Sequence, residues 1–226
     1  TAIQCQQMRN HFVVACLTSP GVGSAHKWLV RQGSQTSELT SELTGYAAPA
    51  LNTITGDGST DASTLGGQAV TLQGTNFPPY GSSLAASNTV VTYSNGIQTF
   101  AASNCLLKYE NRFSSLAFIE CFTVASTGGK LHWDVTVDGQ PSTPPTTSTA
   151  PPMVQHIKDF APATSTTEGG VEFSLVGSEF GPVGLSAPSI EVTYGPTAVE
   201  YTAVGCLVTK VESTGNSTIT CASAEG

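Results

Sequence analysis

Residues 66–77 read GGQAVTLQGTNF, and residues 169–180 read GGVEFSLVGSEF. In both stretches two glycines precede alternating apolar and polar residues, and a phenylalanine follows. Alternation of this kind predicts a β-strand with one buried face, and the paired glycines predict a turn before it. Because the stretch occurs twice, the chain is predicted to consist of repeated antiparallel β modules.

The similarity extends in both directions from this stretch. Residues 49–54 (PALNTI) return as 152–157 (PMVQHI), and the VTY of residues 91–93 returns at 192–194. The repeat distance of about 100 residues is the size of one β-sandwich domain and is too long for a solenoid turn. No confident helix is expected.

These repeats divide the chain into four parts. We expect the C-terminal part of one module at 1–44 and a complete module at 48–142. A Pro/Thr-rich linker at 143–151 would then precede a third module at 152–226 without its last strand. Trp28 and Val30 match Trp133 and Val135, and each tryptophan alternates with valine. Both tryptophans are therefore predicted to pack in a core, on a terminal strand.

The six cysteines indicate an oxidising compartment. None lies in a CxxC motif, which disfavours a zinc ribbon or a thioredoxin-like site. Six cysteines allow 15 pairings, and the repeat favours Cys5–Cys16, Cys105–Cys121 and Cys206–Cys221. Each bond would close a loop of roughly 15 residues and contribute about 3 kcal/mol in the chain-entropy description.

Charge and hydropathy exclude several classes of partner. Sixteen acidic residues against eight basic ones give a net charge of -8, which disfavours binding to a nucleic-acid backbone or an anionic membrane. No apolar stretch reaches the roughly 18 residues of a membrane span, and no signal peptide is visible at Thr1. An extracellular or cell-surface location is expected.

Residues that could carry chemistry are few. The histidines lack a nucleophile motif or a paired-ligand motif, and the acidic loop 57–61 is favoured as a turn over a calcium site. We therefore expect no enzyme activity, no catalytic residue, no metal and no cofactor. Aromatic side chains aligned on one face, such as Tyr80, Tyr93 and Tyr109, would favour sugar binding instead.

Two stretches suggest glycosylation. Residues 216–218 (NST) form the one Asn-x-Ser/Thr sequon, which predicts a surface loop. The stretch 141–152 has the composition of a stiff, O-glycosylated linker, although a plain linker fits as well. The candidate sites are Asn216, Ser142, Thr143, Thr146, Thr147, Ser148 and Thr149.

The order of these motifs resembles the IPT/TIG family of immunoglobulin-like domains. That order is Pro-x-x-x-x-Ile, the Gly-Gly stretch, Val-x-Tyr, a cysteine pair and a terminal Val-x-Val-x-Gly at 135–139. The resemblance implies tandem immunoglobulin-like (E-set) antiparallel β-sandwiches. The third module departs from the pattern, since Glu179 stands where the family favours Asn. Such domains occur in plexin-like, Met-like and fibrocystin-like receptors, in surface proteins, in starch-acting enzymes and in transcription factors of the Rel type, the last disfavoured by the charge and the cysteine pairs.

The expected function is an extracellular structural or adhesive repeat protein, forming or decorating a glycosylated filament such as a flagellar hair or a matrix fibre. Its partners would be neighbouring modules, copies of the same protein and covalent glycans. The alternatives are the ligand-binding stalk of a plexin/Met-like or fibrocystin-like receptor and a spacer or carbohydrate-binding module of a secreted enzyme. Residues 28–32 of one copy could also complete the third module of another, although residues 5–21 would then be surplus because they duplicate 206–226.

Overall fold

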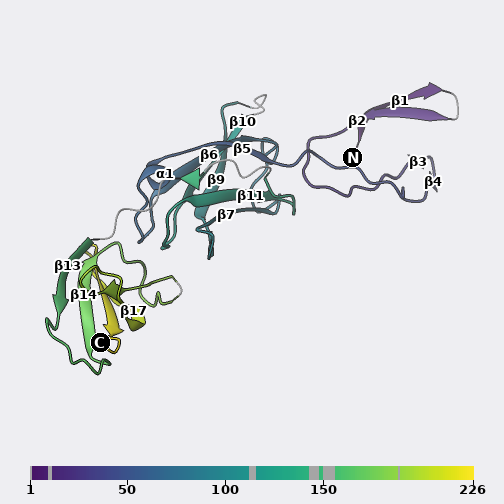
Figure 1. Ribbon diagram of the computed structural model, residues 1–226. Helices are drawn as coiled ribbons and strands as arrows, with labels where there is room; N and C mark the ends of the chain where they lie inside the picture. The colour runs from purple at the N-terminus through teal and green to yellow at the C-terminus, as the bar shows by residue number, and fades with distance from the viewer. Residues whose placement is uncertain (1, 10–11, 112–115, 143–147, 150–155, 188) are drawn as a thin grey trace.

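The computed structural model describes residues 2–9, 12–111, 116–142, 148–149, 156–187 and 189–226 (Figure 1). Over these residues strands are the main regular structure, joined by long loops, and the one helix is α1 (Asp57–Thr60). The all-β prediction is confirmed. The acidic loop around Asp57, predicted to be a turn, forms this single helical turn, in which the Ser59 amide donates to the Gly56 carbonyl.

The middle module is a sandwich of two four-stranded antiparallel sheets. One sheet has the order β5 (Ala50–Thr55), β6 (Ala69–Thr75), β10 (Leu116–Phe122), β9 (Ser103–Tyr109). The other has the order β12 (Ser148–Thr149), β11 (Leu131–Val137), β7 (Thr89–Ser94), β8 (Thr99–Ala101). If β5 to β12 are lettered A, B, C, C′, D, E, F and G in chain order, the two sheets have the strand orders A-B-E-D and G-F-C-C′. This is the arrangement of an immunoglobulin-like sandwich.

The core of this module lies between the two sheets. Val70, Leu72, Ile119 and Trp133 are fully buried, and the rings of Trp133 and Tyr93 stack at 4.5 Å between centroids. Trp133 therefore occupies the core position that the alternating pattern predicts. The same alternation appears as alternate burial along β6 and β10.

One part of the predicted linker belongs to the sandwich. Ser148 and Thr149 pair with His132 and Leu131 as strand β12. The composition of this stretch predicts a stiff, extended linker, and here the backbone of Ser148 and Thr149 completes the edge of β11.

The third module has one full sheet and a small second layer. The sheet has the order β13 (His156–Ala161), β14 (Glu172–Ser178), β18 (Asn216–Ala222), β17 (Val204–Val211). The second layer contains β15 (Thr193–Tyr194) and β16 (Tyr201–Thr202), which pair with each other. Its core is less enclosed, because Phe173, Leu175 and Tyr194 are only half-buried.

The N-terminal segment consists of two hairpins. The first joins β1 (Ile3–Arg9) to β2 (Val13–Leu17), and the second contains β3 (Arg31–Gln32) and β4 (Gln35–Thr36). Their apolar side chains face solvent, with Phe12 87% exposed. The prediction that Trp28 packs in a core is wrong for this structure, because Trp28 is 37% exposed and precedes β3. No second sheet covers it among the described residues.

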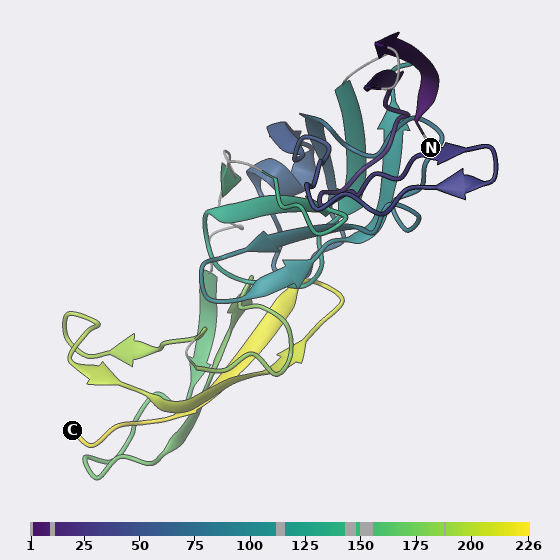
Figure 2. The same ribbon diagram turned by 90° about the vertical axis from the view of Figure 1, so that its right-hand side faces the viewer.

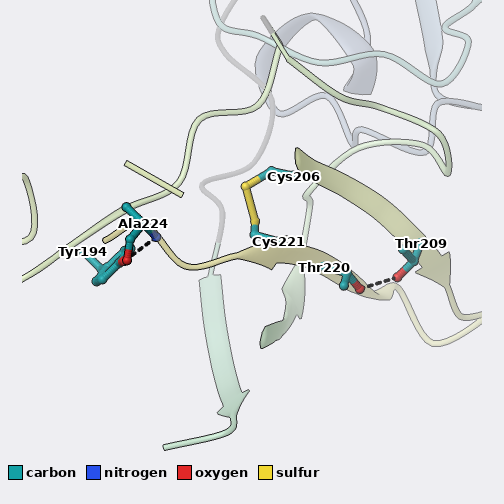
Figure 3. The surroundings of a disulfide bond; sticks show 6 residues. All are labelled: Tyr194, Cys206, Thr209, Thr220, Cys221 and Ala224. Carbon is teal, nitrogen blue, oxygen red and sulfur yellow. Dashed lines mark hydrogen bonds between the residues drawn. A yellow bond between two sulfur atoms is a disulfide. The ribbon is translucent and has the colours of Figure 1, made fainter. Parts of the chain in front are cut away.

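Each cysteine pair forms a disulfide bond between two neighbouring strands of one sheet. The bonds are Cys5–Cys16 between β1 and β2, Cys105–Cys121 between β9 and β10, and Cys206–Cys221 between β17 and β18 (Figure 3). The Cα–Cα distances are 4.0, 4.1 and 4.2 Å. Each bond thus fixes one hairpin, unlike the disulfide of antibody domains, which joins the two sheets.

The parts follow one another along an elongated molecule. Figures 1 and 2 both place the N-terminal segment at one end, the middle module next and the third module at the other end.

Candidate functional site: the junctions between modules

The residues that could carry chemistry lie apart from one another. The His26 ring is hydrogen-bonded to the carbonyls of Val22 and Gly23, whereas His132 lies in β11 and His156 begins β13. His11 is outside the described residues. Within the described part of the chain no three His, Cys, Asp or Glu side chains form a metal-binding group, and no helix is long and apolar enough to cross a bilayer.

The three tyrosines considered for sugar binding do not share a face. Tyr93 is buried, and burial raises its pKa although its hydroxyl is hydrogen-bonded to Ser126 and Val124. Tyr80 is exposed and packs edge-on against Tyr109, with 5.6 Å between ring centroids. The aligned aromatic face that would favour sugar binding is therefore absent from these three residues.

Tyr109 itself lies at the first junction. Its hydroxyl is buried without a hydrogen-bond partner among the described residues, and burial raises its pKa to about 12. The ring lines a cavity of about 530 Å³ between the root of the N-terminal segment and the middle module. The other lining residues come from 20–23, Tyr46, Ala47, Pro49, 76–80, Ala117, Val137 and Gln140.

Direct contacts fix this first junction. Gln140 Nε2 donates to the Tyr46 carbonyl at 3.1 Å, and Val22 packs against the core of the middle module. Gly23 has a φ of 91° and lies so close to Asp138 that an added Cβ would be 2.0 Å from the carboxylate. The positive φ favours glycine at this position, and any added side chain would also displace the Asp138 carboxylate.

A carboxylate fixes the second junction, between the middle and third modules. Glu179 accepts hydrogen bonds from the Thr64 amide at 2.6 Å, from the Thr64 hydroxyl at 2.9 Å and from the Ser63 hydroxyl at 3.1 Å. Beside this contact, a Cβ on Gly181 would lie 2.6 Å from the Thr127 methyl. The loops are thus in close contact, and the charge of Glu179 strengthens the hydrogen bonds that hold them.

The two junctions use corresponding positions of the repeat. The loop after β2 (residues 20–23) lies against residues 76–80, and its counterpart around Thr127 lies against Gly181. Asn76 and Glu179 occupy the same place in the repeat, and both have a left-handed backbone, with φ of 58° and 60°. Asn adopts this conformation readily and Glu does so rarely.

Glu179 is a junction residue whose contacts the sequence does not indicate. Its departure from the Asn of the family pattern is visible in the sequence, whereas its partners lie more than a hundred positions away at Ser63 and Thr64. An unusual residue in a strained conformation, held by several hydrogen bonds, points to a role in the contact itself.

The predicted glycosylation sites fall in different environments. Asn216 is the first residue of β18, half-buried, and accepts a hydrogen bond from Lys158 Nζ, whereas a surface loop was predicted. Ser142 is buried, and its hydroxyl donates to Asp134 Oδ1 at 2.6 Å. A glycan at Ser142 is therefore incompatible with the folded module. Thr143, Thr146 and Thr147 lie outside the described residues, and Ser148 and Thr149 form β12.

Comparison with known proteins leaves the chain without an assigned family. No family profile and no curated protein matches it. Among solved structures it is similar to the full extracellular region of plexin A4, domains 1 to 10, at 17% identity and a TM-score of 0.36, covering 98% of this chain and 17% of that one. A second structure of the plexin A4 extracellular region gives 12% identity and a TM-score of 0.26, covering 79% and 22%. The chain thus spans about a fifth of the length of these proteins.

Proposed function

We propose that this chain is part of an extracellular, non-enzymatic stalk, in which IPT/TIG-type sandwiches hold what they connect at a fixed spacing and orientation. The observation that carries the proposal is the repeated junction, where the same two loops of the module meet at both boundaries. Domains on a free linker would not need such a contact, because relative motion is the default between domains.

The contact at the second junction has the properties of a clamp. Glu179 accepts from a backbone amide and from two hydroxyls, and Thr64 is almost fully buried beneath it. A carboxylate that accepts several hydrogen bonds loses both its solvation and its rotational freedom, and both losses cost free energy. The hydrogen bonds offset this cost only where the donors are already held in place. The clamp therefore favours one orientation of the third module.

The cysteines support the extracellular location. All six are paired, and each pair constrains one hairpin. Bonds of this kind persist in secreted and cell-surface proteins and are rare in the reducing cytosol.

The test is small-angle X-ray scattering on the wild-type chain and on Glu179→Ala, with Glu172→Ala as control because Glu172 is exposed on β14. We expect the wild type and the control to give one extended shape, and Glu179→Ala to give a broader distribution of sizes at unchanged thermal stability. A wild type as broad as Glu179→Ala would contradict the stalk proposal.

A filament is the second candidate function, and one observation favours it. The N-terminal segment exposes a formed hairpin whose apolar side chains belong to no core cluster among the described residues.

A further inference from the structure

We propose that Asn95 and Gly96, in the turn between β7 and β8, form a self-processing site at which the side-chain amide of Asn95 is converted to a carboxyl group. The conversion breaks a contact that supports the middle-module side of the second junction. The inference goes beyond the proposed stalk and rests on it only for the last step, the effect on the third module. These two residues are the single Asn-Gly pair in the sequence.

The side chain of Asn95 is held by three hydrogen bonds. Its Oδ1 accepts from the backbone amides of Ile97 at 2.9 Å and Gln98 at 2.7 Å. Its Nδ2 donates to the Thr127 carbonyl at 2.7 Å. Because the oxygen can only accept and the nitrogen can only donate, these partners fix the orientation of the amide group.

The same contacts favour attack on the side-chain carbonyl of Asn95. Two backbone amides aimed at Oδ1 polarise the carbonyl and stabilise the negative charge that develops on its oxygen during attack. Gly96 is exposed, and the space where its Cβ would lie is empty to 4 Å, so water reaches the turn. The Gly96 amide donates to Ser94 Oγ at 3.1 Å, which gives the departing proton an acceptor.

The reaction is a deamidation, and water is its only co-reactant. The Gly96 nitrogen attacks Asn95 Cγ, so that a new C–N bond forms and the Cγ–Nδ2 bond breaks. Nδ2 leaves as ammonia, because it gains one proton for the one that Gly96 loses. Water then opens the resulting cyclic imide at either carbonyl and gives aspartate or its isomer, in which the backbone runs through the side-chain carboxyl. No atom is oxidised or reduced.

The acceptor of Asn95 Nδ2 lies in a loop of the second junction. Thr127 is buried in the connection 123–130 between β10 and β11. Its methyl group is the atom that a Cβ on Gly181 of the third module would meet at 2.6 Å. The next residue, Gly128, lies against the turn itself, since an added Cβ would be 2.7 Å from Asn95 Cβ. The turn therefore packs directly on the loop that contacts the third module.

A second path leads from this loop to the Glu179 clamp. The amide of Ser126 donates to the Thr64 carbonyl at 3.0 Å. The amide and hydroxyl of Thr64 in turn donate to Glu179. The residue that holds Glu179 is thus itself held by the loop that Asn95 supports.

Conversion replaces a donor by an acceptor at the centre of this contact. A carboxylate oxygen in the place of Nδ2 would face the Thr127 carbonyl oxygen without a proton between them. A buried acceptor that loses its donor in this way is destabilising. The isomer also adds the side-chain methylene to the backbone of the turn, so both products release the loop.

The chemical step is tested by peptide mass spectrometry of the folded 226-residue chain during incubation at mildly alkaline pH. We expect Asn95 to convert at least about tenfold faster than Asn52, which is exposed on β5 and precedes Thr53. We also expect conversion in the folded chain to be at least as fast as in urea. Conversion no faster than at Asn52, or slower in the folded chain than in urea, would overturn the proposal.

The structural step is tested with Asn95→Asp, and Asn52→Asp is the matched control with the same change of charge. We expect Asn95→Asp to lower the midpoint of thermal unfolding by about 5 °C. It should also speed hydrogen exchange at the amides of Val124 and Ser126, which are hydrogen-bonded in the loop. Asn52→Asp should change neither. The converted wild type, separated by its added negative charge, gives the same readout without a variant, and unchanged exchange in both would contradict the inference.

Small-angle X-ray scattering separates this inference from the stalk proposal. A wild type of uniform shape together with an Asn95→Asp chain as broad as Glu179→Ala supports both. A uniform wild type with an equally uniform Asn95→Asp chain overturns the link from Asn95 to the junction and leaves the stalk standing. A broad wild type overturns the stalk and this last step together, whereas the mass and exchange measurements still decide the first two steps.

Discussion

Trp28 and Trp133 occupy equivalent positions of the repeat and have opposite environments. Trp133 is enclosed between two sheets and stacks on Tyr93, whereas Trp28 contacts its own hairpin through an Nε1 hydrogen bond to the Thr44 hydroxyl at 2.8 Å. The same residue in the same local pattern is therefore a core residue in one place and a surface residue in the other.

This difference predicts different costs of truncation. Trp133→Ala should destabilise the middle module by about 3–5 kcal/mol, the usual cost of emptying a large core site. Trp28→Ala should cost less than about 1 kcal/mol in the dilute chain. Urea unfolding at low protein concentration measures both, and equal losses would mean that Trp28 is packed in a core.

Tyr109 gives a second prediction at the residue scale. Its hydroxyl is buried without a partner among the described residues, and such a group costs about 1 kcal/mol or more. Tyr109→Phe should therefore stabilise the chain by up to about 1 kcal/mol, while Tyr80→Phe, at an exposed ring, should change nothing. Thermal unfolding at neutral pH compares the two variants.

The raised pKa of Tyr109 adds a dependence on pH. Burial raises that pKa to about 12 in the folded chain, against about 10 in an unfolded one. Folding thus favours the neutral hydroxyl over the phenolate. Its contribution to the free energy of unfolding is fully present below pH 10 and is lost as the pH rises to about 12. Tyr109→Phe should lose less stability than the wild type between pH 9 and pH 11, and an identical loss would contradict the burial of this hydroxyl.

At the scale of the element, the positions of the strands were largely predictable from the sequence. Which other elements pack against each strand was not. Alternation in residues 70–74 and 171–175 locates β6 and β14, because the side-chain period of a strand is visible in the sequence. The pattern says which side chains share a face but not what lies against that face. This is why the exposure of Trp28 could not be predicted.

Long-range contacts could not be predicted from the sequence for a related reason. Glu179 stands out as a departure from its repeat, yet nothing local indicates Ser63 and Thr64 as its partners. Ser142 was assigned by composition to a glycosylated linker, but its hydroxyl bonds to the backbone and to Asp134 within the middle module. A single polar residue in a linker-like stretch can thus be a structural residue of the neighbouring sandwich.

The disulfides make a prediction at the scale of the element. Cys5 and Cys16 are exposed, whereas Cys121, Cys206 and Cys221 are buried. Reduction requires a thiolate to reach a sulfur atom, so the accessible bond should be reduced first. Mild reduction followed by alkylation and peptide mass spectrometry should label Cys5 and Cys16 before the other four, and simultaneous labelling would mean that the β1–β2 pair is covered in solution.

At the scale of the molecule, contacts at two junctions hold one module against the next. Both junctions bring together corresponding loops, and the second adds the Glu179 clamp. A fixed junction transmits orientation along the molecule, which is what a stalk requires and what a regular filament would also need.

The most direct test of this claim is a distance distribution across the second junction. Spin labels at Val90→Cys on β7 and Phe160→Cys on β13 occupy exposed strand positions in the two modules. Pulsed electron paramagnetic resonance should give one narrow distance distribution in the wild-type background and a broadened one when Glu179→Ala is added. A broad distribution that Glu179→Ala leaves unchanged would show that the modules move freely, and the stalk account would fail.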